Sequence, residues 1–503
     1  MESENLNKKI GNAAKWSSIM QILAKLVSPI TNMILARLLD VSMFGVVATV
    51  NIIISFADMF TDAGFQKYLV QHEFRDEKDR RDSTSVAFWT NMMISVVLWG
   101  LIIIFRNSLA ELVGSPQRGL VIAVACCVLP LTSFSSIQMA LYKRDFDFKT
   151  LFYARIAGIA IPLVVTVPLA LIWRNFWALI AGSIAKEVVN AVILTARSKW
   201  KPSLYYSFDK LKEMFSFSMW TLFEQISIWL TSYIGTFIVG KFLVGNVEEV
   251  EYYTGLYKTS MNTVNQFTSL ITSTFTPVLF SALSRVQNDR KAFKGYFFSF
   301  QKIISMLVIP MGAGLFLYRD LVTEILLGSK WAEASMFIGL WGISSSLCAS
   351  LNNFCSESYR ALGKPKVSLL VQVIHLVFLV PALMWSAGIS YETLYWTRSV
   401  ISLQLYATQL IVIYCVIRIS PWQILKNIYP TLVATGAMTV LALGLQTVSR
   451  SKIWDFVSIA ICIVTYFGVL MAFPEFRKLI VEYTGKLLAK IRKKNKVEEN
   501  NVD

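Results

Sequence analysis

Fourteen apolar segments, each of about 20 residues or more, follow one another along this chain of 503 residues. A helix of about 20 apolar residues spans the hydrocarbon core of a bilayer, and lipid offers no partner for an unpaired backbone amide. The chain is therefore predicted to be an all-α polytopic membrane protein. The predicted spans cover residues 17–36, 44–64, 84–105, 119–140, 151–173, 176–196, 214–240, 254–283, 297–317, 334–357, 367–386, 391–417, 424–446 and 453–473.

The loops between these segments alternate in charge. Loops on one side, with both ends of the chain, carry about 33 lysines and arginines, and the other loops carry about 9. Cationic loops stay in the cytoplasm, so both termini are predicted to be cytoplasmic. The formal net charge of +16 is then mainly an orientation signal, and no basic domain indicates a nucleic-acid partner.

Several kinds of active site are not indicated. No loop exceeds roughly 20 residues, which leaves no room for a soluble catalytic domain, and no glycine-rich phosphate loop occurs. The six cysteines all fall in apolar segments, and the two histidines, His72 and His375, are far apart. We therefore expect no metal and no bound cofactor, and energy from direct ATP hydrolysis is not expected.

The chain carries an internal repeat. Residues 16–21 align without gaps to residues 220–225, and the glutamine that ends each stretch precedes a cation, Arg37 or Lys241, by sixteen positions. Each copy then enters the next helix, at Gly45 or Gly255, and the second copy has extra residues from Asn246 to Glu251 that we interpret as a longer loop. An even number of helices separates the copies, so the repeat is predicted to be parallel.

Five stretches at loops and helix ends resemble the polysaccharide transporter branch of the multidrug/oligosaccharidyl-lipid/polysaccharide exporter superfamily, the Wzx-type flippases. These stretches are residues 36–45, 140–149, 277–285, 327–331 and 359–366. The resemblance covers about residues 10 to 390. It implies an N-terminal lobe over 1–200, a C-terminal lobe over 201–420 and two more helices over 421–474. Helical spacing of apolar and basic residues predicts a cytoplasmic amphipathic helix in the tail, 475–503, which ends in a disordered segment.

The resemblance implies a flippase and not an enzyme, located in the bacterial cytoplasmic (inner) membrane. Such a flippase moves an undecaprenyl-pyrophosphate-linked oligosaccharide to the periplasmic leaflet by alternating access, for export of a cell-surface polysaccharide. Its partners would be this lipid-linked oligosaccharide, membrane lipids, and a polysaccharide polymerase with its chain-length machinery, while the flippase itself would be a monomer.

Two alternatives stay open. A cation-coupled multidrug exporter of the same superfamily would favour an acidic cavity, against which the buried lysines argue. A membrane-embedded glycan polymerase or glycosyltransferase usually needs a sizeable outer loop with charged residues, and here the most acidic outer loop, Glu248 to Glu251, has no basic cluster beside it.

Ionisable and amide side chains inside the predicted spans are the candidate substrate-binding residues, because a charge at this depth normally faces the protein interior or water. The cations could compensate the pyrophosphate, or each could pair with a nearby carboxylate and only fix helix packing. The polar run that contains Asn265 and Gln266 suits a cavity wall, unless its hydroxyls bond back to the helix. The predicted substrate-binding residues are Lys25, Lys186, Lys258, Arg155, Arg398, Gln21, Asn265 and Gln266.

Three carboxylates are the candidates for ion coupling. Asp58 and Asp62 share a face of the second span, and Glu224 lies in the seventh. A carboxyl group in an apolar site can take up a proton near neutral pH, so a proton or sodium gradient could drive transport. Uncoupled flipping, pulled by polymerisation on the far side, is the alternative.

Overall fold

The computed structural model describes residues 27–62, 65–145, 147–449 and 451–478. Every regular element in these ranges is a helix, which confirms the predicted all-α membrane fold. The first predicted span is helical over residues 27–38. The other thirteen lie on α2 (Val41–Asp62), α4 (Glu77–Ile104), α6 (Gly119–Ala125) with α7 (Val128–Arg144), α8 (Phe148–Ile161) with η1 (Pro162–Thr166) and α9 (Val167–Trp173), α10 (Trp177–Arg197), α11 (Phe208–Phe242), α12 (Val247–Arg285), α13 (Arg290–Leu317), α15 (Ala334–Ala349) with α16 (Asn352–Ala361), α17 (Pro365–Ala387), α18 (Tyr391–Ile417), α19 (Pro421–Val448) and α20 (Lys452–Met471).

Among the described residues, eleven helices are long and apolar enough to cross a membrane. α12 makes a twelfth if its two parts, which meet at an angle of 41°, are counted as one span. The two predicted spans outside this count are the first, which is described only in part, and α11, which has 35 residues. Four short helices lie between the spans: α3 (Phe65–Gln71), α5 (Arg106–Leu112), α14 (Arg319–Leu326) and η2 (Ser329–Trp331).

Several helices begin earlier than their apolar segments, because polar caps extend them. The Asp76 side chain accepts a hydrogen bond from the backbone N–H of Asp79, so α4 begins at Glu77. Asn246 and Glu249 cap each other's backbone N–H groups at 2.9 and 3.0 Å. The prediction of a longer loop from Asn246 to Glu251 was therefore wrong, since α12 begins at Val247.

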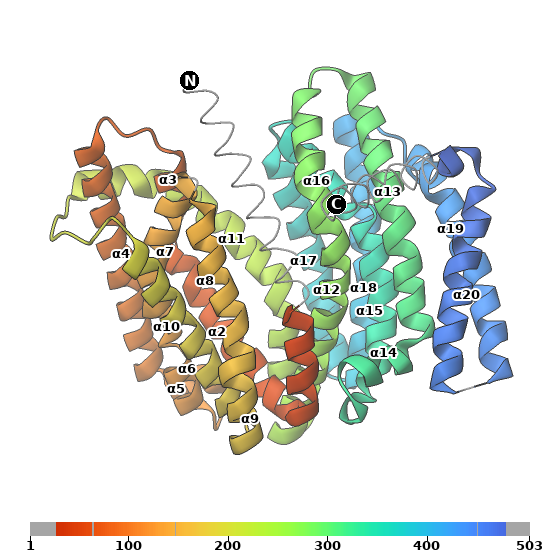
Figure 1. Ribbon diagram of the computed structural model, residues 1–503, viewed down its shortest axis with the longest axis horizontal. Coiled ribbons are helices and arrows are strands. Elements are labelled where there is room, and N and C mark those ends of the chain that lie inside the picture. The colour runs from red at the N-terminus through yellow and green to blue at the C-terminus, as the bar shows by residue number, and fades with distance from the viewer. Residues whose placement is uncertain (1–26, 63–64, 146, 450, 479–503) are drawn as a thin grey trace, which may run out of the picture. The chain divides into compact units, whose positions relative to one another are not determined.

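Contacts within the chain divide it into two units, of which the first comprises residues 1–267, 323–337 and 366–401. In this unit α7 packs on α4 and α10, α8 packs on α10, and α11 packs on α2 (Figure 1). One apolar core joins α2 to α6 and α10 through Val46, Ile122 and Ile180. Every candidate site residue that the structure describes lies in this first unit.

The second unit comprises residues 268–322, 338–365 and 402–503. α19 packs between α13 and α20, and the last two spans stand side by side (Figure 1). Tyr466 of α20 donates a hydrogen bond to the Met306 carbonyl of α13, which ties these helices together. These two units are defined by contacts within the chain, and their limits differ from those of the two predicted lobes. The lobe boundaries at residues 200 and 420 therefore stay predictions. The tail predicted to be amphipathic lies mainly beyond residue 478, outside the described residues.

Matching positions of the repeat make matching contacts within the first unit. A Cβ atom added at Gly45 would lie 1.7 Å from the Glu251 carbonyl oxygen, and one at Gly255 would lie 2.2 Å from the Val41 carbonyl oxygen. α2 and α12 therefore touch backbone to backbone at the two equivalent glycines. This pairing supports the predicted repeat.

The cations that end the first helix and α11 also match. Arg37 donates to the Ile325 carbonyl of α14 at 2.6 Å, and Lys241 donates to the Glu111 carbonyl of α5 at 3.0 Å. α5 and α14 follow the third and ninth spans, which are equivalent in a repeat of six. These pairs of contacts are expected where two copies of one ancestral segment meet.

Candidate functional site

Lys258, in the first third of the membrane-spanning helix α12, contacts an aromatic ring of a neighbouring helix. Its Nζ atom lies 4.2 Å from the centroid of the Tyr233 ring of α11. The Tyr233 ring stacks on Trp229 at 5.8 Å, and the Trp229 indole N–H donates to Ser55 Oγ of α2 at 2.9 Å. We call Ser55, Phe56, Trp229, Tyr233 and Lys258 the aromatic–lysine cluster. No ion pair involves Lys258 in the part of the chain that the structure describes. The face of the Tyr233 ring stabilises its ammonium charge instead.

The helical period explains why these side chains meet. Trp229 and Tyr233 are four residues apart and so project from one face of α11. Phe56 packs against Trp229 with ring centroids 5.0 Å apart, which fixes that face against α2. The cluster thereby combines a cation, two stacked rings and a hydroxyl within the membrane-spanning region, and these groups suit phosphate and sugar.

The polar run of α12 divides into two kinds of residue. Asn265 is exposed and Gln266 half-buried, and both have interactions within the protein. Further along, the hydroxyls of Thr272, Ser273 and Thr276 donate to carbonyls four residues earlier. The back-bonding alternative therefore accounts for these three hydroxyls. Substrate binding by Asn265 and Gln266 stays a prediction.

Lys186 pairs with its sequence neighbour. Its Nζ atom lies 2.8 Å from Glu187 Oε1, and Asn190 donates to the other oxygen of that carboxylate at 3.3 Å. Gly158 of α8 leaves the room for this group, since a Cβ there would lie 3.2 Å from Asn190 Oδ1. The Lys186 charge is thus compensated by Glu187, as the helix-packing alternative expected.

The two arginines of the prediction lie in different surroundings. Arg155 is exposed on α8, three residues before Gly158. Arg398 of α18 is only 6% exposed and lies beside the hydroxyl of Tyr257. Its burial keeps the guanidinium inside the protein. The structure does not place either arginine in the aromatic–lysine cluster.

The candidate coupling carboxylates are described only in part. Asp58 is half-buried on α2, three residues beyond Ser55, and therefore on nearly the same face as the hydroxyl that contacts Trp229. The side chains of Asp62 and Glu224 lie outside the described residues, as do Lys25 and Gln21 entirely. Within the described ranges no group of three or more histidine, cysteine, aspartate or glutamate side chains could hold a metal ion.

An ion pair outside the membrane-spanning segments joins two distant parts of the first unit. Arg118, just before α6, donates to both carboxylate oxygens of Glu251 at 2.9 and 3.0 Å. Glu251 is 3% exposed and Arg118 32%. The bond to Glu251 raises the pKa of the Arg118 guanidinium. Glu251 therefore has one basic partner, Arg118, which lies 133 residues away in the sequence.

Sequence reasoning missed Ser55, Trp229 and Tyr233. Trp229 and Tyr233 follow Gln225, the last residue of the repeated motif, at intervals of four. The motif therefore indicated the face of α11 that carries these two rings. Aromatic residues are common at membrane interfaces, which is why these two did not stand out.

A family model described as polysaccharide biosynthesis protein matches residues 34–336. The succinoglycan biosynthesis transport protein ExoT of Rhizobium meliloti (strain 1021) is 24% identical over 331 residues, which cover 65% of this chain and 64% of that protein. The lipopolysaccharide biosynthesis protein WzxC of Escherichia coli (strain K12) is 20% identical over 385 residues, which cover 75% of each.

Among solved structures, the lipid II flippase MurJ in an inward closed conformation superposes with a TM-score of 0.73 and 12% identity. The match covers 92% of this chain and 99% of that one. At this identity the likeness shows a shared fold, which is that of a multi-pass membrane protein.

Proposed function

The chain belongs to the polysaccharide biosynthesis protein family, and from that premise we propose that it flips a lipid-linked oligosaccharide across the bacterial cytoplasmic membrane. The substrate class is an oligosaccharide joined to undecaprenyl pyrophosphate, moved from the cytoplasmic to the periplasmic leaflet by alternating access. The names of the relatives support transport in polysaccharide biosynthesis. The direction is the one that the resemblance to Wzx-type flippases implies, and the basic loops predict that both termini are cytoplasmic.

The aromatic–lysine cluster is the observation that carries this proposal. A pyrophosphate loses much of its hydration when it enters a membrane protein, so it needs cations there. Lys258 supplies one that has no carboxylate partner among the described residues, whereas Lys186 is paired with Glu187. Tyr233 and Trp229 offer ring faces for the sugars, whereas the Ser55 hydroxyl is occupied, since it donates to the Asn51 carbonyl and accepts from Trp229.

The enzyme alternative has less support. Glu249 caps α12 and Glu251 is bound to Arg118, so two carboxylates of the acidic outer loop have structural partners. A glycosyltransferase or polymerase would need such groups for the reaction. The multidrug alternative would need an acidic cavity, and the membrane-embedded cluster described above carries a lysine.

Flipping of a lipid-linked oligosaccharide in sealed proteoliposomes tests the proposal. We expect Lys258→Met and Tyr233→Leu to reduce the initial rate at least about tenfold, because each removes an interaction of roughly 1.4 kcal/mol or more with the headgroup. Lys302→Met is the matched control, since Lys302 lies in a membrane-spanning helix but pairs with Glu475. Wild-type rates in both cluster variants would refute the role of the cluster. A protein that flips no lipid-linked oligosaccharide would refute the function.

Ion coupling through Asp58 is the second part of the proposal, motivated by its place one turn from Ser55. Flipping should quicken when a proton or sodium gradient is imposed, and Asp58→Asn should remove that response. Rates indifferent to both gradients and to Asp58→Asn would leave uncoupled flipping as the mechanism.

A further inference from the structure

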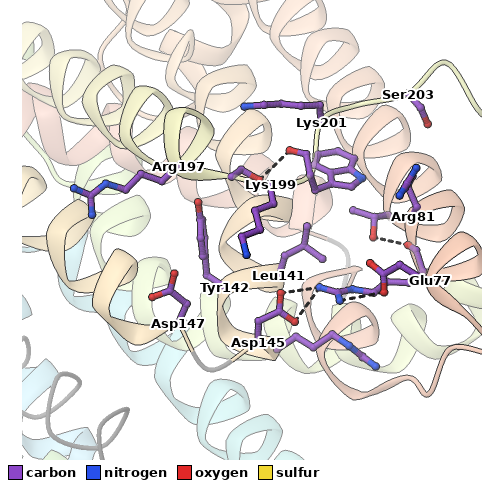
Figure 2. A pocket seen from close by; sticks show the side chains of 15 residues that line it. Glu77, Arg81, Leu141, Tyr142, Asp145, Asp147, Arg197, Lys199, Lys201 and Ser203 are labelled. Atoms are coloured by element: carbon purple, nitrogen blue, oxygen red, sulfur yellow. Dashed lines mark hydrogen bonds and ion pairs between the residues drawn. The ribbon is translucent and has the colours of Figure 1, made fainter. Parts of the chain in front are cut away.

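A basic cavity of about 1050 Å³ lies at the end of α4, α7 and α10 that the charge pattern puts in the cytoplasm. Glu77 and Arg81 come from the start of α4, and Arg197, Lys199 and Lys201 come from the end of α10 and the segment after it (Figure 2). The cavity lies wholly in the first unit. It has no part in the aromatic–lysine cluster, with which it shares no residue.

The charges that line this cavity do not balance. It is lined by six cations and three carboxylates, an excess of three positive charges. Two of the carboxylates, Glu77 and Asp145, both pair with Arg80, at 3.5 and 2.8 Å. The third, Asp147, caps α8 by accepting from the backbone N–H and the hydroxyl of Thr150. No carboxylate of the cavity therefore remains for the other cations.

The remaining cations differ in how far they are engaged. Arg144 donates to the carbonyls of Leu69 and His72, so its guanidinium is occupied. Lys201 donates to the Thr195 carbonyl at 2.7 Å. Four lining cations have no carboxylate partner among the described residues, and these are Arg81, Arg197, Lys199 and Lys201. An anion with several oxygens would complete this arrangement.

An exposed apolar tip follows the cavity in the chain. Leu204 is 96% and Phe208 77% exposed, although both side chains are large and apolar. The segment is held against α4, because the Trp89 indole N–H donates to the Ser203 carbonyl at 2.8 Å and the Tyr206 hydroxyl lies 3.0 Å from that of Thr90. An apolar tip fixed beside basic groups is typical of a surface that dips into the headgroup region of a membrane.

We propose that this cavity binds the phosphate headgroup of an anionic lipid in the cytoplasmic leaflet. Arg81 and Lys199 would contact the phosphate oxygens, and the apolar tip would lie in the acyl boundary beside the lipid chains. Arg197, whose guanidinium lies 4.6 Å from the Tyr153 ring centroid, and Lys201 would add positive charge around them. Two lipids share this chemistry, a bulk phospholipid such as phosphatidylglycerol and a polyprenyl pyrophosphate. The proposal does not depend on transport, because binding from one leaflet needs no flipping.

Lipid titration of the purified full-length protein in a neutral detergent tests the proposal. The probes are short-chain phosphatidylglycerol, farnesyl pyrophosphate and, as a zwitterionic control, short-chain phosphatidylcholine, with binding followed by calorimetry. We expect saturable binding of at least one anionic probe and none of phosphatidylcholine. The double variant R81Q/K199Q should bind that probe about 30-fold more weakly, as expected from the loss of two cation–phosphate attractions.

Matched variants distinguish binding at this cavity from a general effect of net charge on lipid binding. K78Q/R285Q removes the same charge from two exposed helix-end residues, in the first turn of α4 and at the end of α12, that do not line the cavity, and should bind like the wild type. R81K/K199R keeps both charges and should retain most of the binding, which excludes misfolding as the cause of a loss. Selective binding of phosphatidylglycerol would identify a bulk lipid, and selective binding of farnesyl pyrophosphate a polyprenyl lipid; both support the proposal. Unchanged binding in R81Q/K199Q, or an equal loss in K78Q/R285Q, would overturn it whatever the flipping assay shows.

Discussion

The ion pair between Arg118 and Glu251 should respond unequally to the loss of each partner. Arg118→Met leaves a carboxylate that is 3% exposed without its cation, and breaking a buried pair in this way costs about 3–5 kcal/mol. Since Arg118 is 32% exposed, water reaches the pair from one side, so we expect about 3 kcal/mol. Glu251→Gln leaves a partly exposed guanidinium and an amide oxygen that still accepts, so it should cost only about 1 kcal/mol.

Equilibrium unfolding in mixed micelles measures these free energies. The double variant Arg118→Met/Glu251→Gln should cost less than the two single costs added, because no buried charge remains.

A matched control is the pair of Lys330 and Asp40, whose side chains are 50% and 61% exposed. Lys330→Met should cost at most about 1 kcal/mol. A cost of Glu251→Gln equal to that of Arg118→Met, or a cost of Arg118→Met no larger than that of Lys330→Met, would refute this reasoning.

Three further predictions concern other parts of the chain. Gly45→Ala should destabilise the protein by at least about 1–3 kcal/mol in the same unfolding assay, because the added methyl would meet the Glu251 carbonyl. Gly436→Ala, where nothing lies within 4 Å, should be neutral or stabilise by up to about 1 kcal/mol, and an equal loss at both sites would contradict this. Lys302 lowers the pKa of the Glu475 carboxyl, so the stability that separates wild type from Glu475→Gln should be present at pH 7 and fade below about pH 4. That difference should stay under about 1 kcal/mol because Glu475 is 75% exposed, and a difference that grows on acidification would refute the pairing.

The helices themselves could be predicted from sequence, because an apolar run of this length has one stable structure in lipid. Their ends could not be placed from hydropathy. α4 begins seven residues before the predicted span because Asp76 caps it, and α12 begins early because of Asn246 and Glu249. The signals for these caps are present in the sequence, but they lie in the charged segments that hydropathy assigns to loops.

Sequence could predict single charged residues of the candidate site but not the residues that contact them. Lys258 could be found because a lysine inside an apolar span is rare. Its ring partner Tyr233 could not, since the rotation of α11 against α12 decides which faces meet. Lys186 shows a second limit, because the sequence alone does not decide between contact with substrate phosphate and pairing with a nearby carboxylate such as Glu187.

The contact of Gly45 with Gly255 has a consequence for the evolution of the family. The predicted repeat makes the two glycines copies of one ancestral residue, so that one ancestral glycine would supply both sides of the contact. After duplication neither copy can acquire a side chain alone, because the opposing backbone occupies the space that its Cβ would need. Both positions are therefore expected to stay glycine, because a simultaneous change would add two clashes with backbone and relieve neither.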